Sequence, residues 1–166
     1  MDKDRSKVSI YLKVENLAKQ FNIPKSMVRD IISEYVAYCK KLIKHGIRVD
    51  FVGLVAIEPS TEQGTYSITN AYICHKIADA LSLTLNTVQT VVQTYLDGIV
   101  EEIMNERCAE IRGLVTIKVL DDVVHSYISS TLKDDLNPNV ESVRVHTSRF
   151  LRQKLKLSKG GGADDW

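Results

Sequence analysis

An internal repeat with an offset of 60 residues constrains the fold of this 166-residue chain more than any other feature. Residues 17–58 align without a gap on residues 77–118, and eight of these 42 positions are identical. Unrelated sequences of ordinary composition would share about two or three such positions. The identical pairs are Ala18/Ala78, Val28/Val88, Tyr35/Tyr95, Ile43/Ile103, Gly53/Gly113, Leu54/Leu114, Val55/Val115 and Ile57/Ile117. We interpret the chain as a tandem duplication of one structural unit.

Both copies predict the same order of elements. A short helix with apolar residues at helical spacing comes first, and a break at Pro24 or Thr84 separates it from a longer helix over residues 25–45 or 85–105. Two short strands follow, over residues 47–57 and 109–119. A glycine interrupts each pair of strands. Gly53 and Gly113 therefore predict tight turns that need a positive φ or close packing.

A long helix followed by a hairpin that turns at Gly-Leu-Val-x-Ile, at residues 53–57 and 113–117, resembles the HU and integration-host-factor (HU/IHF) family of bacterial histone-like proteins. Members of that family continue with a basic β-ribbon arm, a returning third strand and a short last helix. In the second copy, residues 142–146 resemble the returning strand and residues 150–155 the last helix. In the first copy, residues 65–68 are the expected third strand, and the last helix is missing.

The resemblance implies an α+β fold of two tandem HU/IHF-like units, each with two helices and a hairpin or three-stranded sheet. We expect the first copy over residues 1–64, the second over residues 65–157 and a flexible glycine-rich tail over residues 158–166. Family members are usually intertwined dimers. The two copies are therefore expected to pair within one chain as a pseudo-dimer, and the alternative is that each pairs with a neighbouring chain in a ring or open assembly.

The arms that family members use to bend DNA are shortened or acidic here. In the first copy, residues 58–64 contain two glutamates and no basic residue. In the second copy, residues 120–140 contain four aspartates and one lysine, Lys133. Asn137-Pro138 resembles the family's intercalating Asn-Pro, but the preceding arginine is absent, so we interpret it as a turn. The arm-based mechanism of DNA bending is therefore not expected.

Charge is distributed unevenly along the sequence. The net charge is +1 overall, and it is the sum of +4 over residues 1–60, −6 over residues 61–140 and +3 over residues 141–166. One basic cluster lies near the C-terminus: Arg144, Arg149, Arg152, Lys154, Lys156 and Lys159. It is a candidate contact with DNA phosphates or with an acidic partner, and the alternative is a solvated helix face.

The C-terminal tail is a second candidate site. Three glycines precede Asp164, Asp165 and Trp166, so these last residues could dock into a neighbouring subunit, and the alternative is a disordered end.

No catalytic or metal-ligating pattern is evident. The sequence has no Ser/His/Asp or Cys/His constellation and no glycine-rich phosphate loop, and its three cysteines and four histidines lack the spacing of a zinc site. We therefore expect neither an enzyme nor a cofactor, metal or small-molecule substrate. There is also no apolar run long enough to cross a membrane and no secretory signal, so a membrane or secreted protein is not expected.

Two hypotheses about function remain. The first is a structural protein that acts as a protein–protein assembly block, because duplicated, arm-poor HU-like proteins resemble virion components of tailed phages, including crAss-like phages. In that role, as part of a connector or tail ring, its partners would be further copies or neighbouring virion proteins. The second is an architectural histone-like DNA-binding protein. The expected location is accordingly a phage virion or the bacterial cytoplasm.

Overall fold

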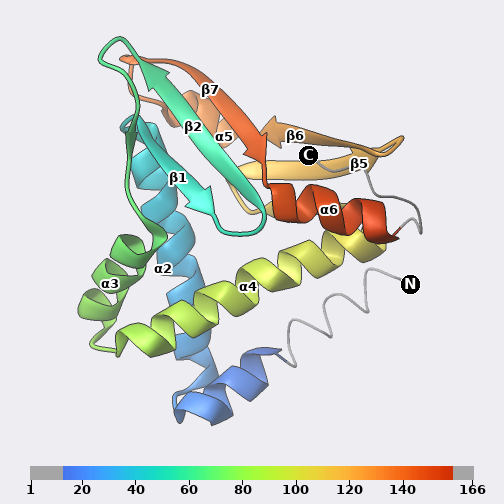
Figure 1. Ribbon diagram of the computed structural model, residues 1–166. Coiled ribbons are helices and arrows are strands. Elements are labelled where there is room, and N and C mark those ends of the chain that lie inside the picture. Colours follow the sequence, from blue (N-terminus) through green and yellow to red (C-terminus); the bar gives the residue numbers. More distant parts are fainter. Residues whose placement is uncertain (1–12, 159–166) are drawn as a thin grey trace.

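The computed structural model describes residues 13–158, which form an α+β fold with two sheets (Figure 1). Residues 13–21 are helical. The elements that follow are α2 (Lys25–Lys44), β1 (Ile47–Phe51), β2 (Val55–Thr61), β3 (Tyr66–Ser67), α3 (Asn70–Leu81), α4 (Leu85–Glu106), β4 (Cys108–Ile111), β5 (Val115–Leu120), β6 (Val123–Ile128), α5 (Ser130–Asp135), β7 (Val140–Thr147) and α6 (Arg149–Ser158). The α+β class expected from the sequence is confirmed.

The two long helices form the centre of the molecule. α2 and α4 contact each other, α3 contacts both, and the two sheets lie on the same side of α4 in Figure 1. Apolar residues spaced three and four apart give each long helix one buried face, and side chains from both helices belong to one continuous core. α3 and α4 begin at capping threonines, since the hydroxyls of Thr69 and Thr84 accept hydrogen bonds from the N–H groups of Tyr72 and Thr87.

The local geometry of the first half recurs 60 residues later. Asn22 and Ser82 end their helices with φ values of 54° and 55°. The turn glycines Gly53 and Gly113 have φ values of 82° and 79°, as predicted. The N–H group that follows each glycine bonds back to the end of the preceding strand at 2.9 Å. The hairpin registers also match, since Phe51 pairs with Val55 and Ile111 with Val115.

The third strands pair differently from the sequence-based expectation. The strand expected over residues 142–146 forms as β7, but it pairs antiparallel with β2 of the first half. The sheet orders are β3-β1-β2-β7 and β4-β5-β6. β7 does not pair with β5 because β6, in the region treated as an arm, already occupies that edge. The strand expected over residues 65–68 forms as β3, but it is parallel to β1 and only two residues long.

A strand–serine–helix segment follows each hairpin. The N–H of Ser129, after β6, donates to the carbonyl of Leu114 at 2.9 Å, and the N–H of Ser148, after β7, donates to that of Leu54 at 3.0 Å. Three residues beyond each serine, a fully buried leucine anchors the helix, Leu132 in α5 and Leu151 in α6. We call residues 13–61 with 140–158 unit one, and residues 70–136 unit two. In the sequence, the elements of unit two thus follow β2 and precede β7 of unit one.

The two units interlock through their last helices. α5 of unit two contacts α2 of unit one, and α6 of unit one contacts α4 of unit two. After α5, the N–H of Asn137 donates to the carbonyl of Lys44 at 3.1 Å, and its side-chain amide is 2.8 Å from Nδ1 of His45. Each unit therefore supplies part of the packing of the other.

Candidate functional site

The arm position of unit two is closed by a tight turn. β5 and β6 are joined at Asp121 and Asp122, which have φ values of 50° and 66°. Positive φ at both central residues is the requirement of a type I′ turn, the usual two-residue closure of a hairpin. The expected arm region therefore consists of this turn, β6 and α5. No basic ribbon extends from unit two within the described residues.

In unit one, the segment that follows β2, where an arm is expected from the resemblance, leads through β3 into unit two. β2 ends at Thr61, whose hydroxyl donates to the carbonyl of Gly64 at 2.9 Å in a short turn before β3. The segment from β2 through β3 contains Glu58 and Glu62 and no basic residue. Asn137-Pro138 forms the expected turn, because the N–H of Val140 bonds to the carbonyl of Asn137 at 2.9 Å. With Asn137 bonded to the end of α2, this Asn-Pro is not placed to intercalate.

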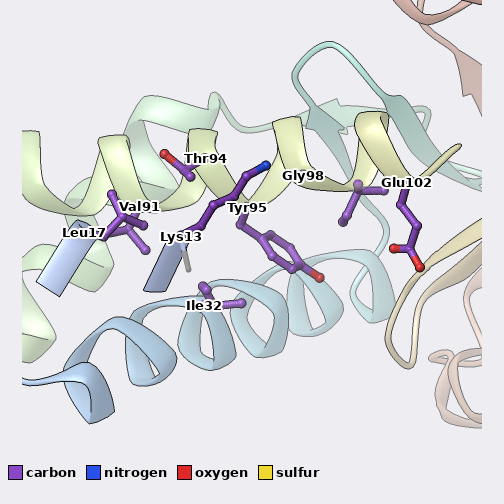
Figure 2. Close-up of a pocket in the computed structure, with 9 residues that line it drawn as sticks. Lys13, Leu17, Ile32, Val91, Thr94, Tyr95, Gly98 and Glu102 are labelled. Carbon is purple, nitrogen blue, oxygen red and sulfur yellow. The ribbon is translucent and has the colours of Figure 1, made fainter. Parts of the chain in front are cut away.

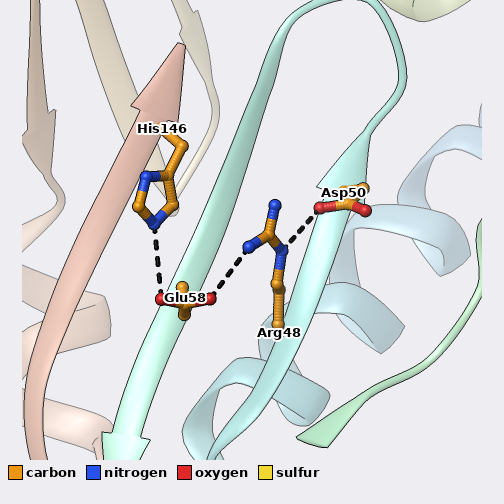
Figure 3. A network of polar contacts seen from close by, with 4 residues as sticks. All are labelled: Arg48, Asp50, Glu58 and His146. Carbon is orange, nitrogen blue, oxygen red and sulfur yellow. Dashed lines mark hydrogen bonds and ion pairs between the residues drawn. The ribbon is translucent and has the colours of Figure 1, made fainter. Parts of the chain in front are cut away.

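The outer face of the first sheet carries a network of alternating charges (Figure 3). Arg48 of β1 donates from Nε to Asp50 at 2.9 Å and from Nη1 to Glu58 of β2 at 2.8 Å. The other oxygen of Glu58 is 3.4 Å from Nε2 of His146 on β7. The Arg48 guanidinium lowers the pKa of Glu58, and His146 lowers it further. Since carboxylates neutralise Arg48, this face offers a phosphate chain little net positive charge.

The basic cluster predicted from the sequence is divided between two elements. Arg144 is exposed on β7, opposite Glu58 in the ladder. The four basic residues of α6 are Arg149, Arg152, Lys154 and Lys156, and α6 contains no acidic residue. Lys159 and the docking-tail residues Asp164, Asp165 and Trp166 lie outside the described residues.

An exposed phenylalanine on α6 is a feature that the sequence analysis missed. The hydroxyl of Ser148 caps the helix by accepting from the N–H of Leu151 at 3.1 Å. Leu151 and Leu155 face the core, and Phe150 is left 49% exposed next to the Gly53 turn. The ammonium of Lys154 lies 5.3 Å from the centre of the Phe150 ring. α6 therefore presents an aromatic ring among cations, and only the 3.6-residue periodicity of its leucines could have indicated this.

A small apolar groove lies between α4 and the helix over residues 13–21 (Figure 2). The groove and the open solvent at its mouth together occupy about 400 Å³, and Ile32 of α2 lines one side. The remaining lining residues are Lys13, Leu17, Val91, Thr94, Tyr95, Gly98, Ile99 and Glu102. The sequence signal for this groove is Gly98, a glycine inside a long helix where the repeat has Tyr38.

Charged groups lie at the mouth of the groove. Lys13 pairs with Glu101 at 2.7 Å. Burial raises the pKa of Glu102, and the carboxylates of Glu106 and Glu110 raise it further. Burial also raises the pKa of Tyr95 to about 12, so its hydroxyl is neutral at physiological pH. The groove thus combines an apolar interior with an acidic end.

The described residues contain no group of three or more His, Cys, Asp or Glu that could hold a metal ion. The same part of the chain has no helix long and apolar enough to span a membrane. Cys39 and Cys74 are buried free thiols whose pKa values burial raises, as expected for apolar core positions. Comparisons of the chain with protein-family models, curated proteins and solved structures found no match.

Proposed function

We propose that this chain is a non-enzymatic HU/IHF-like structural protein that acts as a protein–protein assembly block. The setting implied by the resemblance is a phage virion, where the protein would form part of a connector or tail ring. The observation that carries the proposal is that neither unit has a basic arm at the place where the resemblance predicts one, within the described residues. At that place, unit two has a two-residue turn at Asp121 and Asp122, and in unit one the chain leads into unit two.

The recurrent geometry supports the HU/IHF-like part of the proposal. Each unit contains two helices, a glycine-turned hairpin, a third strand and a last helix in the same order, with matching hairpin registers. The interlocked last helices give one chain the arrangement that the family reaches by dimerisation. A closed pseudo-dimer leaves its outer surfaces free for further contacts.

Exposed apolar side chains support a role in assembly. Val52, which precedes Gly53, and Phe150, which lies next to that turn, are half exposed, and Leu120 and Val123 are half exposed at the tip of the β5–β6 hairpin. Apolar side chains gathered at exposed tips are typical of surfaces that contact other proteins. The neutralised sheet face favours such contacts over binding to a polyanion.

A second candidate function is DNA binding, and α6 is the observation that favours it. Its four basic residues without an acidic one could contact phosphates, and the exposed Phe150 ring could contact a base or sugar. This would be a surface contact by one helix and not the bending of DNA by two arms.

The two functions are separated by DNA binding measured at two salt concentrations. The protein is mixed with a duplex of about 40 base pairs at about 50 mM and about 200 mM salt, since release of counterions makes phosphate binding steeply salt-dependent. We expect weak binding at the lower concentration and none at the higher. Tight binding with a steep salt slope, abolished by Arg149→Glu with Lys154→Glu, would overturn the assembly proposal in favour of DNA binding.

A further inference from the structure

The groove between α4 and the helix over residues 13–21 corresponds, 60 residues away, to the filled contact between α2 and α3. At three of its lining positions the equivalent apolar or aromatic side chain is replaced by a glycine or a charged residue: Ile73 by Lys13, Tyr38 by Gly98 and Leu42 by Glu102. In the α2–α3 contact, Ile73 and Leu42 are buried and Tyr38 packs against the core. The groove therefore lacks an aromatic ring and two apolar side chains that the equivalent contact contains.

Gly98 keeps the groove open although the surrounding structure does not require a glycine. Among the described residues, a Cβ atom on Gly98 would meet Nζ of Lys13 at the ordinary contact distance of 3.5 Å and no other atom within 4 Å. A glycine inside a helix destabilises it by about 0.5–1 kcal/mol relative to alanine. This cost is understandable if something from outside uses the space next to the helix backbone.

The charge around the groove favours a basic occupant. α4 contains Asp97, Glu101, Glu102 and Glu106 and no basic residue. Glu101 is paired with Lys13, whereas the charged groups of the described residues that shift the pKa of Glu102 are the carboxylates of Glu106 and Glu110. An aromatic ring carried among cations would complement both the apolar interior and the acidic end of the groove.

The chain itself carries such a ring. The exposed aromatic residues of the described chain are Tyr66, Tyr72, Tyr127 and Phe150. Phe150 alone among them lies on an element with several basic residues and no acidic one. It also lacks a hydroxyl that would need a hydrogen-bond partner inside an apolar groove.

From these observations we propose that the α4 groove receives Phe150 of a second copy of this chain, with Lys154 and Arg149 of that copy near the acidic rim. This inference rests on the proposed assembly function and specifies its partner. α6 and the helix over residues 13–21 lie on different sides of α4 in Figure 1. One copy can therefore offer its α6 while its groove accepts another, which is a heterologous contact that builds a ring or an open chain.

The test measures self-association of the full chain by light scattering and sedimentation at about 100 µM, well above the dissociation constants of typical specific contacts. The wild type is expected to associate. Phe150→Ala should weaken association at least about 30-fold, the loss typical of a central interface side chain. Gly98→Tyr, which restores the residue of unit one, should do the same. Mixing the two variants should give 1:1 dimers, because each retains one half of the contact.

Charge-reversal variants provide a test that spares the core. Lys154→Glu with Arg149→Glu changes only exposed side chains and should abolish association. The matched control is Lys76→Glu, since Lys76 lies 5.3 Å from the Tyr72 ring, the same distance as Lys154 from Phe150. It should associate like the wild type.

Three outcomes would overturn the inference. A wild type that stays monomeric at this concentration removes the second copy as occupant, while the assembly proposal is still judged by its own DNA test. Association that survives both Phe150→Ala and Gly98→Tyr assigns assembly to another surface. Association of Gly98→Tyr at the wild-type level, while Phe150→Ala loses association, places the binding site of Phe150 outside the groove.

Discussion

Units one and two place the same tyrosine in very different surroundings. Tyr35 of unit one is fully buried, donates from its hydroxyl to Oδ1 of Asn70 at 2.7 Å, and meets the Phe51 ring edge-on at 6.2 Å between ring centres. Tyr95 of unit two lines an open groove. Three side chains that fill the α2–α3 contact are replaced at the equivalent positions around this groove, by Lys13, Gly98 and Glu102. The comparison teaches that two similar packing arrangements in one chain can differ, one closed by its own side chains and the other open at the surface.

The units also differ in how the chain completes them. Unit two is continuous from α3 to α5, whereas unit one depends on β7 and α6 from the end of the chain. Because α6 also contacts α4, the completion of unit one adds packing to unit two. The units are therefore expected to unfold together and not as separate domains.

The largest expected effect is that of removing either anchoring leucine. Leu151→Ala in α6 and Leu132→Ala in α5 each delete a fully buried side chain, so each should lower the free energy of unfolding by about 2–5 kcal/mol. Urea unfolding followed by circular dichroism measures this loss. A single transition is expected for both variants. Two separate transitions for Leu151→Ala would show that unit two is stable without α6.

The next effect distinguishes the two tyrosines. Tyr35→Phe leaves Oδ1 of the part-buried Asn70 without its donor and should cost about 1–3 kcal/mol in unfolding free energy. The same change at Tyr95, whose ring borders the groove, should cost less than about 0.5 kcal/mol. Urea denaturation of the matched pair measures both values. Equal losses would mean that the two environments are energetically alike.

Local patterns in the sequence were sufficient to predict α2, α3, α4, α6 and the β1–β2 and β4–β5 hairpins, but not α5 or the β5–β6 hairpin. Apolar spacing located α2 and α4, and the turn glycines and capping threonines fixed where elements begin and end. The partner of β7 could not be predicted, because its alternating pattern specifies a strand but not the edge it joins. β6 was missed because Asp121 and Asp122 were counted as acidic arm residues, although their backbone forms a hairpin turn.

The candidate surfaces were harder to predict than the fold. The basic residues of α6 were visible in the sequence, but the exposure of Phe150 depends on which face of α6 packs inward. The groove depends on Lys13, Gly98 and Glu102, which come from two helices far apart in the sequence. Comparing them with their equivalents 60 residues away becomes informative only once the packing of those helices is known.

A smaller effect, of opposite sign, is expected at Gly98. Gly98→Ala should raise the free energy of unfolding by about 0.5–1 kcal/mol, since alanine stabilises a helix interior and its Cβ has room. Thermal unfolding measures the gain. The matched control is Gly113→Ala, which should lower stability by about 1–2 kcal/mol because φ is 79° there. A lower free energy of unfolding for Gly98→Ala would contradict the open space assigned to the groove.

The smallest effect concerns the acidic end of the groove. Burial and the carboxylates of Glu106 and Glu110 place the pKa of Glu102 above its unfolded value, so ionisation of Glu102 destabilises the folded state at neutral pH. As the pH falls through the raised pKa, protonation removes that cost. Glu102→Gln should therefore raise the melting temperature at pH 7. The corresponding gain in the free energy of unfolding should stay within about 0.5 kcal/mol, because solvent screens the group.

Melting curves of Glu102→Gln and the wild type across the acid range test this difference between the units. The advantage of the variant should disappear below a pH of about 4, where glutamate is protonated in both states. Glu101→Gln is the matched control, because Glu101 is exposed and paired with Lys13 at 2.7 Å, and its loss should give no gain at pH 7. An advantage of Glu102→Gln that persists unchanged at low pH would mean that side-chain packing, and not charge, distinguishes this position from Leu42 of unit one.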